Sequence, residues 1–289
     1  MTIKPINNLK LFSIASLNGV SQIMLQENSV TGIFFLVGIA ISSLNMALAA
    51  LLATIVGTAT AYLFKYNFEE IQKGLYGFSA ALVGVAIVLF FKLTVATWLL
   101  VIVGAAIATI IQHFFIKRNI TAFTLPFVLV TWLFYYAASF LHPTLLASQF
   151  PLIPSENDIY FFYIKGYGQV IFQANIWSGV LFLLGVFFHS RIAAIYGLAG
   201  GAIAGLAALP LASSDAVANG LLSYNAVLCA IVFAGVKFKN CLWAFISVVL
   251  SLVIILLLQN LNILALTFPF VAASFLTLKI KNRNQASPL

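Results

Sequence analysis

The sequence predicts an all-α polytopic membrane protein, and three observations support this prediction. Of the 289 residues, 63% are hydrophobic and only 7% are charged, whereas soluble domains carry about 25% charged residues. Apolar runs such as "CLWAFISVVLSLVIILLL", which starts at Cys241, recur along the chain. Runs of about 20 apolar residues are typical of spanning helices. Membrane β-barrels instead show short alternating segments.

Ten spanning helices are expected, five in each half of the chain, and no cleavable signal peptide is expected before them. The expected spans of the first half are residues 30–45, 46–64, 73–91, 95–115 and 122–141. Those of the second half are residues 175–189, 192–210, 219–236, 240–259 and 265–280.

The distribution of basic residues predicts the orientation. With the N-terminus placed in the cytoplasm, all of the 14 lysines and arginines except Lys92 and Lys165 fall on the cytoplasmic side. Cytoplasmic loops of membrane proteins are enriched in such residues. The net charge of +8 therefore indicates topology rather than nucleic-acid binding. Both termini are expected in the cytoplasm, with the chain in a bacterial inner membrane and lipid as its surroundings.

The chain contains an internal repeat. "NGVSQIMLQENSVTGIFFLVG" begins at Asn18, and the similar "KGYGQVIFQANIWSGVLFLLG" begins at Lys165. Two further pairs follow in the same order: "GLYGFSAALVG" with "GLLSYNAVLCA", and "TLPF" with "TFPF". We therefore expect a first repeat at 1–141, a periplasmic or extracellular linker at 142–164 and a second repeat at 165–289.

Five spans in each repeat are an odd number, so the two repeats are expected to lie upside down relative to one another. Inverted repeats usually place a solute site at their interface near the membrane midplane. Residues 16–28 are too short and polar to cross about 30 Å of hydrocarbon. We expect one half-membrane re-entrant helix in each repeat, carrying Gln22 or Gln169. The alternative is a helix lying on the membrane surface.

The second repeated motif predicts walls for that site. Phe78 and Leu82 are four residues apart, as are Tyr224 and Leu228, so each pair lies on one helix face. Ordinary helix packing is the alternative.

The third repeated motif places a threonine two residues before a proline. Thr124 precedes Pro126, and Thr267 precedes Pro269. Such a threonine offers a hydroxyl, and the proline leaves carbonyls without an N–H partner. Proline also suits a helix start, and both interpretations can hold together.

The predicted solute is small, flat, polar and neutral, because no charged residue is repeated in the three motifs. Glu27 is opposite Ala174 in the repeat, so we expect it at a pore mouth or the surface. Cys229 and Cys241 are expected to be unpaired. No nucleophile–base set, metal cluster or phosphate loop is present in the pattern, which argues against an enzyme or a cofactor.

At these motifs the chain closely resembles the urea transporter family, and the resemblance covers roughly residues 18–280. It implies a homotrimer in which urea passes dehydrated through a slot in each protomer. It also implies a set of solute-binding positions: Gln22, Gln169, Thr124, Thr267, Phe78, Leu82, Tyr224, Leu228, Ile23, Val170, Leu25 and Phe172. Ile23 and Val170 correspond to the central constriction. The chain departs from the family pattern at Ser79, where asparagine is usual, at Tyr224 and at Leu25.

A passive urea channel has two competitors. An ion-coupled secondary transporter of a small amide would need a titratable group in the path. An ammonia channel would be expected to bury histidines in its pore. The three histidines, His113, His142 and His189, are expected at loop ends.

Overall fold

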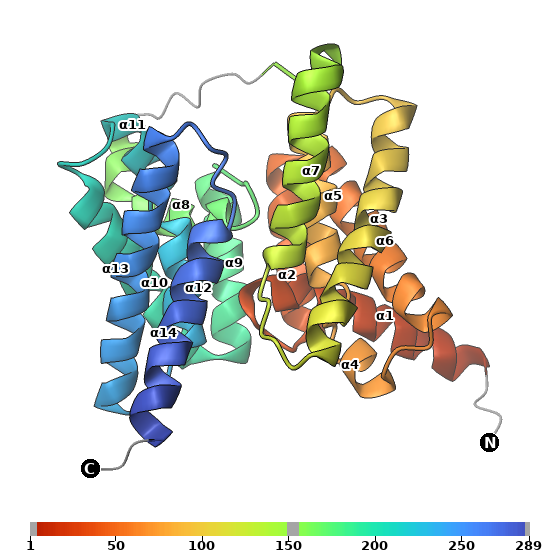
Figure 1. Ribbon diagram of the computed structural model, residues 1–289, viewed down its shortest axis with the longest axis horizontal. Coiled ribbons are helices and arrows are strands. Elements are labelled where there is room, and N and C mark those ends of the chain that lie inside the picture. Colours follow the sequence, from red (N-terminus) through yellow and green to blue (C-terminus); the bar gives the residue numbers. More distant parts are fainter. Residues whose placement is uncertain (1–4, 149–155, 287–289) are drawn as a thin grey trace. The chain divides into compact units, whose positions relative to one another are not determined.

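The computed structural model describes residues 5–148 and 156–286, which form helices and short turns (Figure 1). In these residues there is no β-strand, only an isolated bridge between Phe91 and Leu146. The all-α prediction is confirmed. The chain divides into two compact units, Met1–Phe150 and Pro151–Leu289. Their boundary falls within the expected linker, of which residues 149–155 lie outside the described residues.

The helices of the first unit follow one another with short connections. They are α1 (Pro5–Ser21), η1 (Gln22–Met24), α2 (Ser29–Ser42), α3 (Leu44–Leu63), α4 (Phe68–Gln72), α5 (Phe78–Phe90), α6 (Val95–Lys117), α7 (Leu125–Leu141) and η2 (Pro143–Leu145). The helices of the second unit are η3 (Glu156–Tyr160), α8 (Phe162–Gln169), α9 (Ile176–His189), α10 (Arg191–Ala208), α11 (Ser214–Ala218), α12 (Tyr224–Val232), α13 (Phe238–Asn260) and α14 (Phe268–Ala286).

The same order of elements recurs in the two units, from α1 to α7 and from α8 to α14. Their turns agree as well, because eight of the nine described residues with positive φ, all except Lys65, occur in pairs at matched positions. The pairs are Leu25 and Phe172, Gly74 and Gly220, Asn119 and Asn262, and Phe123 and Leu266. These matched turns agree with a duplicated sequence, while the opposite orientation of the two halves stays a prediction.

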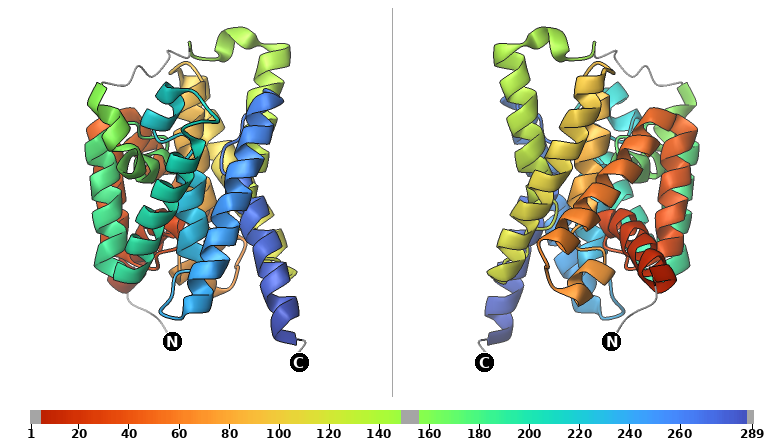
Figure 2. Two further views of the ribbon diagram at one scale, coloured as in Figure 1. Left: turned by 90° about the vertical axis from the view of Figure 1, so that its left-hand side faces the viewer. Right: turned by 90° about the vertical axis from the view of Figure 1, so that its right-hand side faces the viewer.

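Each of the ten expected spans contains a helix, but the helices differ in length. In the described part of the chain, four are long and apolar enough to cross a membrane alone: α3, α6, α10 and α13. The pair formed by α1 and α2, bent by 71° (Figure 2), would be a fifth if it counts as one span. Helix α5 is shorter than its expected span of 73–91, because Gly74 has a φ of 79° and a turn precedes Phe78.

Serine residues separate the first two spans of each unit. Ser43 is extended, and its Oγ accepts a hydrogen bond from the Met46 N–H at 3.3 Å. Ser190 is extended too, and its Oγ accepts from the Ala193 N–H at 3.2 Å. Serine caps helices well because it satisfies an N–H group that the helix leaves unpaired. The first break therefore lies at Ser43 and not between residues 45 and 46 as expected.

Small residues bring the central helices of each unit close together. A Cβ atom on Gly84 of α5 would lie 2.6 Å from the Ala49 carbonyl oxygen of α3. A Cβ atom on Gly200 of α10 would lie 2.6 Å from the Ala230 Cβ of α12. Close backbone approach of this kind is how helices associate in membranes, where the surrounding lipid is equally apolar. Helices α5 and α12 are consequently buried along most of their length.

Candidate solute site

Each unit begins with a helix that ends in a tight turn. Helix α1 starts at Pro5 and has 17 residues, so the expected short helix at 16–28 is wrong in its bounds: the helix starts earlier and ends at Ser21. Helix α8 has only 8 residues. Asn28 and Asn175 then cap the next helices, because their Oδ1 atoms accept hydrogen bonds from the Thr31 N–H at 3.0 Å and the Trp177 N–H at 2.8 Å.

A second repeated glutamine stabilises each turn from within. Gln26 Nε2 donates to the Met24 carbonyl at 2.6 Å, and Gln173 Nε2 donates to the Ile171 carbonyl at 2.6 Å. Both side chains are buried. Part of the repeated polar motif therefore builds the turn itself and does not face a solute.

The turns hold a large side chain in a backbone conformation that such residues rarely adopt. Leu25 has a φ of 61° and Phe172 a φ of 59°. The left-handed region costs an ordinary residue about 1–2 kcal/mol. Strain of this kind is typical of functional sites when the surrounding structure enforces it. Here it occurs at two matched positions, three residues after Gln22 and Gln169.

Gln22 and Gln169 make the same hydrogen bond in the two units. Gln22 Nε2 donates to the Lys73 carbonyl at 2.9 Å, and Gln169 Nε2 donates to the Asn219 carbonyl at 3.0 Å. Each accepting residue stands directly before a glycine with positive φ. The bond commits the donor end of each amide, so the oxygen Oε1 is the end left to accept an N–H group.

A hydrogen-bonded network fixes the segment that holds Gln22. The Tyr76 hydroxyl donates to Glu70 Oε2 at 2.5 Å and lies 3.0 Å from His113 Nδ1. The Tyr66 ring stacks on the His113 ring, with centroids 3.6 Å apart and planes at 5°. His113 lies near the C-terminal end of α6, so it joins α6 to the segment that carries Lys73. No second histidine takes part in this network.

The predicted wall residues lie at the starts of α5 and α12. Phe78 and Tyr224 are the first residues of these helices, and Leu82 and Leu228 follow one turn later, both fully buried. Ile23 and Val170 are also buried beside the glutamines. Their roles as slot walls and constriction stay predictions.

In the second unit, hydrogen bonds connect the start of α12, which carries the predicted wall residue Tyr224, to α14 and the segment just before it. The Tyr224 hydroxyl donates to the Leu266 carbonyl at 2.6 Å. Asn225 Oδ1 accepts from the Phe270 N–H, in the first turn of α14, at 3.0 Å. The corresponding residue of the first unit is Ser79, whose buried Oγ has no hydrogen-bond partner among the described residues. The departure from the family pattern at Ser79 thus removes an anchor between two helices.

Thr124 and Thr267 are buried immediately before α7 and α14. Pro126 and Pro269 are the second residues of these helices. The interpretation as helix starts is therefore correct, and a contact between either hydroxyl and a solute stays a prediction.

A cavity of about 410 Å³ lies in the first unit and brings three of the predicted residues together, Gln22, Leu25 and Phe78. Three polar residues that the sequence did not single out line it as well: Gln112, Asn119 and Thr121. Gln112 is not marked by the repeat, because the repeat places Ile255 at the matching position. Asn119 does have a partner in Asn262, and the shared asparagine was the signal that could have identified it.

An ion pair lies next to Gln169. Lys165 was expected in an external loop, but it belongs to α8 and is only 5% exposed. Its Nζ lies 2.6 Å from Asp158 Oδ2 and 3.5 Å from Asn219 Oδ1. The lysine charge is therefore neutralised beside the residue that holds Gln169. Glu27 is exposed, in agreement with the expected place at a mouth or surface.

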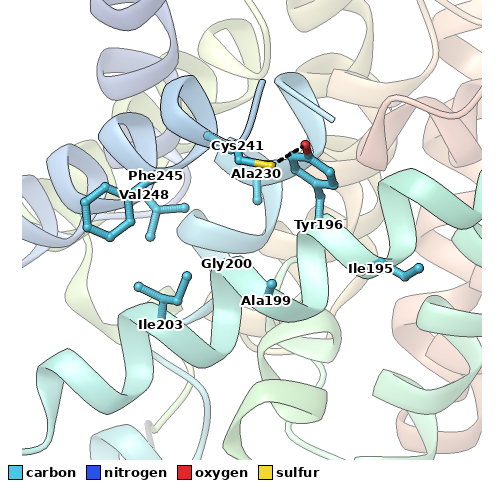
Figure 3. A pocket seen from close by; sticks show the side chains of 10 residues that line it. Ile195, Tyr196, Ala199, Gly200, Ile203, Ala230, Cys241, Phe245 and Val248 are labelled. Atoms are coloured by element: carbon cyan, nitrogen blue, oxygen red, sulfur yellow. Dashed lines mark hydrogen bonds between the residues drawn. The ribbon is translucent and has the colours of Figure 1, made fainter. Parts of the chain in front are cut away.

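The second unit has an apolar groove of about 250 Å³ between α10, α12 and α13 (Figure 3). Its polar feature is a contact of 3.0 Å between the Tyr196 hydroxyl and Cys241 Sγ. Ile195 and Phe245 on its rim are exposed, as on a surface that faces lipid. None of the predicted solute-binding residues lines this groove.

Long apolar helices, together with two matched segments in which a helix and a tight turn with a buried amide precede a second helix, are typical of an integral membrane protein. The family model described as "Urea transporter" matches residues 14–282, and the chain belongs to the urea transporter family.

Three curated relatives, each named Urea transporter 1, illustrate the similarity. The protein of Rattus norvegicus is 26% identical over 237 residues, which cover 76% of this chain and 62% of the relative. The proteins of Mus musculus and Ovis aries are 25% and 27% identical over the same length and shares. The aligned part of the chain thus spans about 62% of the length of these relatives.

Proposed function

We propose that the protein is a passive, selective channel for urea and small neutral amides. The observation that carries this proposal is the matched pair Gln22 and Gln169. The donor ends of both amides bond to carbonyls of the protein, at 2.9 and 3.0 Å, which leaves acceptor oxygens for a solute. Urea has four N–H donors and one carbonyl acceptor, so it is the kind of solute that such oxygens can hold.

The energetics favour a neutral solute. A polar group that loses water without a new partner costs about 1–3 kcal/mol. Amide and hydroxyl oxygens along the path would offset that cost for urea. Apolar walls such as Phe78 and Leu82 offer nothing to an ion, whose desolvation is far more costly.

Each of the two competing functions needs a particular kind of side chain in the path, and the candidate site does not favour either of them. Ion coupling would need a titratable side chain in the path, but Gln22 and Gln169 are neutral and Lys165 is paired with Asp158. An ammonia channel would need pore histidines, whereas His113 is stacked on Tyr66. An enzyme is not supported either, because the family is named for transport.

The proposed assembly follows from the repeat and the charge distribution. The halves at 1–141 and 165–289, joined by the linker at 142–164, would lie in opposite orientations with the slot at their interface. We propose a homotrimer in the bacterial inner membrane, with both termini in the cytoplasm. The segregation of basic residues supports this orientation.

Stopped-flow urea flux into proteoliposomes tests the function. We expect rapid downhill flux that does not change when a membrane potential or a pH gradient is imposed, because no charged residue is repeated in the three motifs. Empty liposomes are the control. Accumulation of urea against its gradient, driven by protons or sodium, would contradict the channel.

The threonines allow a finer test of the path. Thr124→Val and Thr267→Val keep the side-chain shape and remove the hydroxyl, which is worth about 0.5–1.5 kcal/mol as a hydrogen bond. We expect each variant to slow urea flux about twofold to tenfold, and the double variant to slow it further. If both single variants match the parent at equal yield of folded protein, the threonines serve only as helix starts.

A further inference from the structure

Gln112 has a buried side chain whose amide the protein does not use. It lies on α6 and is only 6% exposed. Its Oε1 is enclosed, and neither end of the amide bonds to a described residue. Buried polar groups are almost always hydrogen-bonded, so an unpaired amide at this place indicates a partner that comes from outside the chain.

The cavity of the first unit is where that partner would be bound. Gln112 lines it together with Gln22, Leu25 and Phe78. Its volume of about 410 Å³ is many times the roughly 30 Å³ that one water occupies in the liquid. The cavity can therefore hold a small solute that still keeps part of its hydration shell.

The chemistry of an unused amide defines the solute. A glutamine side chain presents a carbonyl acceptor and an NH₂ donor next to each other. Urea and primary amides present an N–H and a carbonyl next to each other as well. No hydrogen bond to a described residue holds the Gln112 amide, so its side chain can turn the enclosed Oε1 toward the cavity and form two parallel hydrogen bonds with such a solute. The Gln22 amide is held in place, because its Nε2 donates to the Lys73 carbonyl at 2.9 Å.

The same subsite cannot exist in the second unit. Helices α6 and α13 correspond at a constant offset, which places Ile255 opposite Gln112. Ile255 is a buried aliphatic side chain. The amide is therefore a feature of one mouth, next to the end of α6 that carries Lys117.

We propose that Gln112 is a solute-binding residue at the mouth formed by the first unit, where its amide pairs with the N–H and carbonyl edge of urea or a primary amide. The inference rests on the proposed urea channel and adds an entry subsite to it. The subsite binds the half-hydrated solute before it enters the slot and favours amides over solutes that lack this edge.

The test is the concentration dependence of urea flux in proteoliposomes. Gln112→Met keeps the length of the side chain and removes the amide. We expect the half-saturating urea concentration to rise about fivefold to a hundredfold, the range for two lost hydrogen bonds. Acetamide carries the same edge, so it should inhibit urea flux in the parent and lose potency by a similar factor in the variant.

The matched control is Ile255→Met, which introduces the same residue at the corresponding place in the second unit. Half-saturation and acetamide inhibition should stay at the parent values there. If Gln112→Met does not fold, Gln112→Asn withdraws the amide from the cavity and should raise half-saturation too.

Two outcomes overturn the inference in distinguishable ways. If the parent conducts urea and the Gln112 variants keep its half-saturation, the amide holds only water, and the channel proposal stands without this subsite. If the parent itself conducts no urea, the proposed function fails and the subsite fails with it.

Discussion

Gln169→Leu is expected to reduce urea flux about tenfold or more and to lower stability. The substitution removes the acceptor oxygen proposed for urea. It also removes the buried hydrogen bond of 3.0 Å to the Asn219 carbonyl, and the loss of a buried partner costs about 1–3 kcal/mol. Flux in proteoliposomes and the thermal unfolding midpoint in detergent measure the two effects separately.

Gln22→Leu separates transport from folding. Gln22 makes the same bond to the Lys73 carbonyl at a more exposed position. We expect a comparable loss of flux with a smaller change in stability. Gln259→Leu, which changes an exposed glutamine near the end of α13, is the matched control and should conduct like the parent. If both site variants conduct like the parent, the two segments are only anchors.

The sequence predicted the helices well because apolar runs directly reflect the membrane. It placed their ends less well. Ser43 and Ser190 break the chain between apolar residues, where hydropathy hardly changes. Residues 5–10 resemble a polar tail in the sequence, yet they form the first part of α1. Helix formation does not require an apolar stretch.

The candidate site was predictable as far as it is repeated. Gln22 and Gln169 were found because each appears at the same place in both halves. Their partners were not, because the carbonyls of Lys73 and Asn219 belong to the backbone and have no side-chain signature. Gln112 was missed for the opposite reason, since an unrepeated glutamine in an apolar helix looks like any tolerated polar residue.

The burial of Lys165 could not be predicted from the sequence either. Lys165 looked like a loop residue because it follows the linker, and the positive-inside rule counts charges without seeing burial. The ion pair with Asp158 depends on η3 lying directly before α8, a short helix that the sequence pattern did not indicate.

Gly220→Ala is expected to have the largest effect on the folded protein. Gly220 has a φ of 73°, which costs an alanine about 1–2 kcal/mol. A Cβ atom there would lie 2.6 Å from the Gly166 nitrogen and 2.7 Å from the Lys165 carbonyl carbon. These are backbone atoms of α8, so they cannot rotate away as a side chain would.

The clash would push α8 away from the turn that holds Gln169. Overpacking of this kind costs about 1–3 kcal/mol or more, so the total of roughly 2–5 kcal/mol is a large part of a typical stability of about 5–15 kcal/mol. We expect a much lower yield of monodisperse protein, a lower thermal midpoint and reduced urea flux per folded molecule. Gly74→Ala should behave alike, because its Cβ would lie 2.3 Å from the Asn18 carbonyl carbon.

Gly201→Ala is the matched control in the same unit, because Gly201 lies within helix α10. Its Cβ would meet the Val227 Cγ2 atom at 3.0 Å, and the end of a side chain can move by a few tenths of an ångström. We therefore expect a small change in stability and near-normal flux. Equal thermal midpoints and fluxes for Gly220→Ala and Gly201→Ala would mean that the turn can relax, and that the position of Gln169 does not depend on contact between this glycine and α8.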